Sequence, residues 1–144
     1  LENLAEEPSA ACIKLMQAFW PGPLTLLFKP KPSSIHKNIT ADLIGIRQPG
    51  NSVTRNILSA LDHPLTAPSA NISGGNPATT AQQVQDTFGK KVELILDAGV
   101  CRGGKPSTLV NATDNPARLI RAGEIDFKII QECLNGCLQT KESL

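Results

Sequence analysis

Prolines and glycines divide this sequence into short runs that alternate between helix-like and strand-like patterns. The clearest break is Pro21-Gly22-Pro23, which ends an amphipathic run at residues 9–19 and precedes the apolar run at residues 24–28. Because such runs alternate along the chain, and two strand-like runs lie close together near its end, the pattern predicts an α/β or α+β fold. We expect a twisted mixed sheet flanked by helices.

The apolar periodicity and the capping residues predict the individual elements. Helices are expected at residues 9–19 after Ser9, at 52–61 after Asn51 or Ser52, from Thr79 or Thr80 to Gly89, and after Asp126. Strands are expected at residues 24–28, 43–47, 65–68, 92–96, 108–110 and 118–121. The apolar stripe predicted for the second helix consists of Val53, Ile57, Leu58 and Leu61.

Length and composition are those of an ordinary globular domain, with 144 residues, 40% hydrophobic and 19% charged. We find no signal peptide and no long apolar run, so we expect a cytoplasmic protein without membrane association and with free thiols. Cys133 and Cys137 lack the usual spacing of a metal knuckle, and His36 and His63 are distant in sequence. No metal site is therefore expected, and both histidines are interpreted as surface or capping residues.

The net charge of +1 identifies no partner, but basic residues are spread along most of the chain. This distribution would suit a phosphate-bearing ligand or an RNA surface. It is equally typical of solubilising surface charges, which is the commoner explanation for any one of these residues.

The stretch from Thr66 to Pro77 combines three hydroxyls, two amides and two adjacent glycines. Short polar side chains can bond to exposed backbone or to a ligand, and glycines let a backbone approach that ligand closely. The stretch is therefore either a binding loop or a polar turn that leads into the next helix. Composition alone favours the turn.

Common catalytic motifs such as Walker A, G-x-G-x-x-G, H-E-x-x-H and G-x-S-x-G are absent. Polar clusters instead follow predicted strands: Arg47, the loop of Ser69, Asn71 and Ser73, and the run at residues 105–108 followed by Arg121. Arginines can grip a carboxylate or a phosphate with two hydrogen bonds. Such a site would act by positioning and charge stabilisation, as in phosphoryl or nucleotidyl transfer.

Six motifs in this order resemble those of the YrdC-like threonylcarbamoyl-AMP synthases, in particular the short, single-domain bacterial type. The matching stretches are Phe19-Trp20-Pro21-Gly22-Pro23-Leu24-Thr25, Ile44-Gly45-Ile46-Arg47-Gln48-Pro49, Ala67-Pro68-Ser69-Ala70-Asn71-Ile72-Ser73-Gly74, Asp97-Ala98-Gly99, Pro106-Ser107-Thr108-Leu109-Val110 and Leu119-Ile120-Arg121-Ala122-Gly123. They span roughly residues 10 to 125.

The resemblance implies a YrdC-like sheet with a concave ligand face and a nucleotidyltransferase activity. The reaction would join L-threonine, bicarbonate and ATP into threonylcarbamoyl-adenylate and release pyrophosphate. Mg²⁺ could accompany the ATP. The product would serve tRNA modification, completed by downstream threonylcarbamoyl transferase proteins.

The resemblance also implies roles for six residues of this chain. Threonine would be bound by Arg47, by the backbone of Ala67 and by Ser107, and ATP by Ser69, Asn71 and Arg121. No residue is assigned as an acid, a base or a nucleophile.

The family's first strand and its basic K-x-R motif have no counterpart in this sequence. We therefore expect a partial YrdC-like domain over residues 1–134, followed by a polar tail at 135–144. The alternative function is a non-catalytic module of the same fold that binds double-stranded RNA or a nucleotide.

Overall fold

The computed structural model describes residues 1–32, 42–101 and 104–136 of the chain. It consists of two compact units, one formed by Leu1–Arg55 and Lys105–Leu144 and the other by Asn56–Gly104. His36 and Cys137, which entered the sequence analysis, lie outside the described residues.

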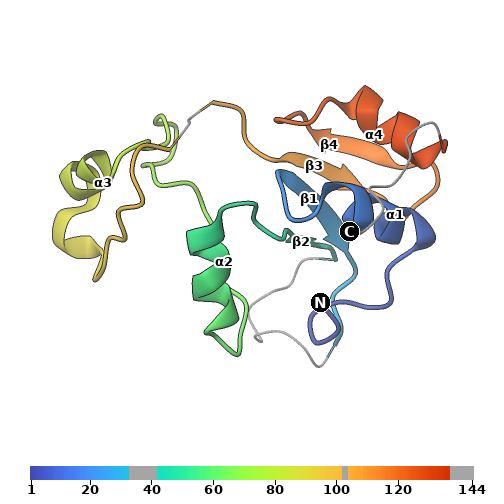
Figure 1. The fold of residues 1–144 in the computed structure, drawn as a ribbon, viewed down its shortest axis with the longest axis horizontal. Coiled ribbons are helices and arrows are strands. Elements are labelled where there is room, and N and C mark those ends of the chain that lie inside the picture. The colour runs from blue at the N-terminus through green and yellow to red at the C-terminus, as the bar shows by residue number, and fades with distance from the viewer. Residues whose placement is uncertain (33–41, 102–103, 137–144) are drawn as a thin grey trace. The chain divides into compact units, whose positions relative to one another are not determined.

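A four-stranded mixed sheet forms the centre of the first unit (Figure 1). Its strands lie in the order β2 (Ile44–Ile46), β1 (Leu24–Phe28), β3 (Thr108–Asn111) and β4 (Arg118–Arg121). Strands β1 and β3 are parallel, whereas β2 and β4 run antiparallel to their neighbours. The starts of β1 and β3 therefore lie at the same end of the sheet as the ends of β2 and β4.

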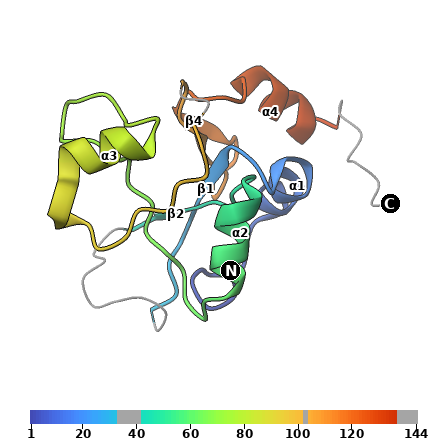
Figure 2. The ribbon, with the colours of Figure 1, turned by 60° about the vertical axis from the view of Figure 1, so that its left-hand side comes forward.

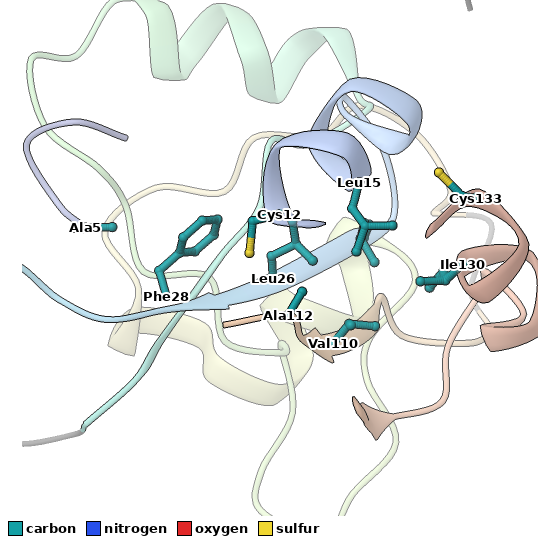
Figure 3. Packing of buried hydrophobic residues seen from close by; sticks show 10 residues of the cluster. Ala5, Cys12, Leu15, Leu26, Phe28, Val110, Ala112, Ile130 and Cys133 are labelled. Atoms are coloured by element: carbon teal, nitrogen blue, oxygen red, sulfur yellow. The ribbon is translucent and has the colours of Figure 1, made fainter. Parts of the chain in front are cut away.

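Helices α1 (Ala10–Phe19) and α4 (Phe127–Leu134) pack together over one face of this sheet (Figures 1 and 2). Side chains alternate between the two faces of a strand, so β1 directs every second residue toward the helices. Figure 3 shows the resulting core, in which Leu15 of α1 lies between β1 and Ile130 of α4. The buried apolar residues are Ala5, Cys12, Leu15, Leu24, Leu26, Phe28, Val110, Ala112, Ile130 and Cys133.

Capping residues fix the starts of both helices, as the sequence predicts. The Ser9 hydroxyl accepts from the backbone N–H of Cys12 at 3.1 Å and donates to the carbonyl of Ala112 at 2.6 Å. A single side chain thus caps α1 and ties it to the segment after β3. Asp126 caps α4 by accepting from the backbone N–H of Lys128.

The second unit contains little regular structure. Helix α2 (Ser52–Ser59) runs into it from the first unit, followed by α3 (Ala81–Phe88) and the short 3-10 helix η1 (Gly89–Lys91). The predicted start and end of α3 are confirmed, because Thr80 and Gln83 form a capping box and Gly89 is the C-terminal cap.

Two predicted strands are wrong. Residues 65–68 and 92–96 form no strand, and Leu94 and Leu96 are 72% and 60% exposed. Apolar alternation identifies a segment that could join a sheet, but a strand exists only where a partner pairs with it. Among the described residues neither segment has such a partner.

The predicted buried stripe of α2 is also wrong. None of the residues of α2 is buried, and Val53 is 45% exposed. The periodicity correctly marks an amphipathic helix, but it does not say what covers the apolar face. Within the described parts of the chain, no helix is long and apolar enough to cross a membrane.

Replacing Leu26 by alanine tests the importance of the face covered by α1 and α4. Leu26 is fully buried, so Leu26→Ala should lower the free energy of unfolding by about 2–5 kcal/mol in urea denaturation. The matched control is Leu119→Ala in β4, where the leucine is 38% exposed and the loss should be below about 1 kcal/mol. Equal losses for the two variants would contradict the assignment of the core.

Candidate functional site

Three polar side chains are joined by hydrogen bonds at the end of the sheet where β1 and β3 begin. The hydroxyls of Thr25 and Ser107 lie 2.8 Å apart, and Nη2 of Arg121 donates to the Ser107 hydroxyl at 3.1 Å. Thr25 belongs to β1, Ser107 directly precedes β3, and Arg121 is the last residue of β4. The cluster therefore results from the strand directions, although its members are far apart in sequence.

The Arg121 guanidinium is held in place although it is exposed. Besides the bond to the Ser107 hydroxyl, Nη2 and Nε donate to the Ser107 carbonyl at 3.0 Å and 3.3 Å. These three bonds use one edge of the guanidinium, and Nη1 has no hydrogen-bond partner among the described residues. A cation that is already oriented loses less side-chain entropy when an anion binds to it.

The backbone around Ser107 is fixed by an unusually close approach of Gly123. A Cβ atom at Gly123 would lie 2.3 Å from the Thr108 nitrogen and 2.4 Å from the Pro106 carbonyl oxygen. Only glycine lets the chain after β4 pass so close to the start of β3. Glu124 then donates its backbone N–H to Pro106, and the buried Thr108 hydroxyl bonds to both backbone groups of Ile125.

Arg47 follows β2 at the same end of the sheet and is exposed. The chain after β2 stays beside the start of β1, because the backbone N–H of Gly22 donates to the Gln48 carbonyl at 2.9 Å. Gly45, two residues before Arg47, lies next to Thr25, since a Cβ there would be 3.3 Å from the Thr25 methyl group. Alternation along the strand thus places Arg47 on the face of the sheet that carries Thr25.

The polar loop in the second unit has a defined internal structure. The side-chain amide of Asn71 donates to the carbonyls of Ile72 and Gly75, both at 3.0 Å, and so closes the turn between them. Its carbonyl oxygen is buried and has no hydrogen-bond partner among the described residues. Ala67 and Ser69 are exposed. The prediction that the stretch leads into the next helix is confirmed, because it is followed by the capping box of Thr80.

The structure thus brings two of the six predicted site residues into direct contact, Ser107 and Arg121, and places Arg47 at the same end of the sheet. Ala67, Ser69 and Asn71 belong to the other unit, so a pocket shared with the first three stays a prediction. Thr25 is not among the six residues predicted from the sequence to form the site. Its signal was present, since Thr25 is the single polar residue of β1.

Other titratable groups are arranged as structural or surface features. His63 bonds to Asp62 at 2.7 Å with both side chains exposed, and this hydrogen bond lowers the pKa of the Asp62 carboxyl. Burial raises the pKa of the Cys133 thiol, with nearby Lys14 acting in the opposite direction. Within the described ranges, no three His, Cys, Asp or Glu side chains are grouped so that they could hold a metal ion.

Residues 1–123 match the model of the Sua5/YciO/YrdC family, which carries the description "Telomere recombination". The chain belongs to this family. Among curated relatives, the threonylcarbamoyl-AMP synthase of Pyrococcus abyssi is 36% identical over 136 residues, which cover 93% of this chain and 40% of that protein. The Bacillus subtilis synthase is 33% identical, with 91% and 38% covered.

Solved structures of family members have the same fold. P. abyssi Sua5 complexed with L-threonine superposes with a TM-score of 0.85 at 34% identity, over 92% of this chain and 39% of that one. Escherichia coli YciO superposes with a TM-score of 0.77 at 25% identity, over 88% and 62%. The expected mixed α+β class is therefore confirmed, and the chain spans about 40% of the length of its Sua5 relative.

The close approach of Gly123 predicts that a single added methyl group disturbs the site. Gly123→Ala should lower the free energy of unfolding by about 1–3 kcal/mol, because its Cβ would overlap backbone atoms that cannot move independently. The control is Gly50→Ala, whose Cβ would meet the Gly22 Cα at an ordinary 3.6 Å. Urea denaturation of both variants is the measurement, and equal stability would contradict the tight packing at Gly123.

Proposed function

We propose that the chain is part of a threonylcarbamoyl-AMP synthase that uses L-threonine, bicarbonate and ATP. The observation that carries this proposal is the clustering of Thr25, Ser107 and Arg121, with Arg47 at the same end of the sheet. Two arginines and a pair of hydroxyls suit ligands that carry both carboxylate and phosphate groups. The names of the relatives and the L-threonine complex of P. abyssi Sua5 support the same activity.

In the proposed reaction, the threonine nitrogen bonds to the carbon of bicarbonate with loss of water. An oxygen of the resulting carbamate then bonds to the α-phosphorus of ATP as the bond from that phosphorus to pyrophosphate breaks. Arg47 and Ser107, together with the Ala67 backbone, would bind threonine. Arg121 and Ser69 would bind the phosphates of ATP, with Asn71 as a further ATP-binding residue. Oriented donors lower the barrier of such a transfer by stabilising the charge that develops on the phosphate oxygens. The ordered guanidinium of Arg121 fits this role, since neither N–H group of its Nη1 is used by another residue in the described part of the chain.

The remaining expectations accompany this proposal. Mg²⁺ would enter with the nucleotide, because magnesium is commonly held by substrate phosphates together with one or two carboxylates. The adenylate would be consumed in the cytoplasm by the proteins that modify tRNA.

The direct test is release of pyrophosphate from ATP by the protein that contains these 144 residues. Release should require both L-threonine and bicarbonate, and omission of either substrate should abolish it. Pyrophosphate release at the same rate with and without threonine would contradict the proposal. Binding of double-stranded RNA with a steep salt dependence and no pyrophosphate release would instead favour the non-catalytic alternative.

The two arginines should affect different substrates. Arg47→Ala should raise the KM for threonine and Arg121→Ala the KM for ATP, each by about 10–100-fold, the usual effect of losing a charged hydrogen bond. Arg118→Ala is the matched control in β4, because Arg118 is exposed and pairs with Asp114 at 3.1 Å. Equal effects of all three substitutions on both KM values would indicate a general loss of positive charge.

A further inference from the structure

The order of the strands places four polar residues in one row across the end of the sheet. From β2 to β4 this row contains Arg47, Thr25, Ser107 and Arg121, with Ser107 two residues before Leu109, the β3 residue that pairs with both Thr25 and Arg121. Leu26 pairs with Ile46, so the continuing antiparallel register brings Arg47 beside Thr25. Thr25 therefore lies between the two arginines, and an anion bound to it would have a cation on either side.

A count of donors and acceptors shows that the two hydroxyls have one proton to spare. Arg121 can only donate, so the Ser107 oxygen accepts its N–H at 3.1 Å. One hydroxyl proton is used in the 2.8 Å contact between Ser107 and Thr25. The other proton has no acceptor among the described residues. The pair can therefore donate one hydrogen bond to a ligand, and the ligand atom must be an acceptor.

The charge of Arg121 decides which hydroxyl carries the spare proton. A hydroxyl that accepts from a cation becomes a stronger donor, and hydrogen bonds arranged in one direction strengthen each other. The favoured order is thus Arg121 to Ser107 to Thr25, which leaves the Thr25 proton free. The Thr25 methyl group points toward β2, where a Cβ added at Gly45 would lie 3.3 Å from it, while the Thr25 hydroxyl lies 2.8 Å from that of Ser107.

We propose that Thr25 is a further binding residue of this site, the last donor in a relay from Arg121 through Ser107, and that it donates to an anionic oxygen of a substrate. This inference rests on the proposed function, under which the oxygen belongs to the threonine carboxylate. A phosphate oxygen of ATP has the same chemistry. The two sources are separated by measuring each substrate independently.

The test compares Thr25→Val, which keeps the shape but removes the hydroxyl, with Thr25→Ser, which keeps the hydroxyl. Calorimetric titration should show L-threonine binding weakened about tenfold by Thr25→Val and within about threefold of the original for Thr25→Ser. ATP binding should change less than about twofold. A tenfold loss confined to ATP would still support an anion-binding Thr25, with a phosphate as its partner.

A matched control removes a comparable hydroxyl elsewhere. Thr113 is half-buried and donates to the Asn111 side chain at 2.6 Å, so Thr113→Val should leave the binding of both substrates unchanged. The relay also predicts that the losses in threonine affinity are not additive, because either substitution already interrupts the chain of hydrogen bonds. The double variant Thr25→Val/Ser107→Ala should therefore bind threonine only slightly more weakly than the weaker-binding single variant.

Several outcomes would overturn the inference. Unchanged binding of both substrates by Thr25→Val, with only a lower melting temperature, would make Thr25 a structural residue. Equal weakening by Thr25→Ser would assign the effect to packing, and additive losses in the double variant would exclude a relay. Absence of threonine binding by the original protein would overturn the proposed function as well, so the two failures are distinguishable.

Discussion

The candidate site depends on the hydrogen bonds that the Arg121 guanidinium donates to Ser107. They connect the end of β4 to the residue before β3, and they fix a charged group that would otherwise move freely at the surface. Gly123 supports this arrangement, because the chain after β4 passes the backbone at Pro106 and Thr108 so closely that a Cβ atom there would overlap it. Backbone packing at Gly123 thus helps to fix Ser107, the residue that orients the Arg121 guanidinium.

The hydrophobic core and the candidate site use different parts of the first unit. One face of the sheet carries the buried apolar residues that pack against α1 and α4. The polar row lies at one end of the sheet, with Thr25 and Gly45 side by side and the hydroxyls half-buried. Strand alternation produces this separation, because neighbouring residues of β1 such as Thr25 and Leu26 face in opposite directions. Substitutions at the polar end can therefore change ligand binding without creating a cavity in the hydrophobic core.

Much of the local structure could be predicted from the sequence. The bounds of β1 and β4 and the caps at Ser9, Thr80 and Asp126 agree with the structure, because they depend on neighbouring residues. The strands predicted at residues 65–68 and 92–96 do not form, because strand formation depends on a partner that local periodicity cannot identify. For the site, the motifs singled out Arg47, Ser107 and Arg121. The link through Thr25 required the register between β1, β2 and β3.

The most direct test of this account is a crystal structure of the protein with bound L-threonine. We predict that the threonine carboxylate lies at the polar end of the sheet, with an oxygen within about 2.5–3.2 Å of the Thr25 hydroxyl and Arg47 beside it. Threonine bound elsewhere, for example against the face covered by α1 and α4, would contradict the assignment of the site.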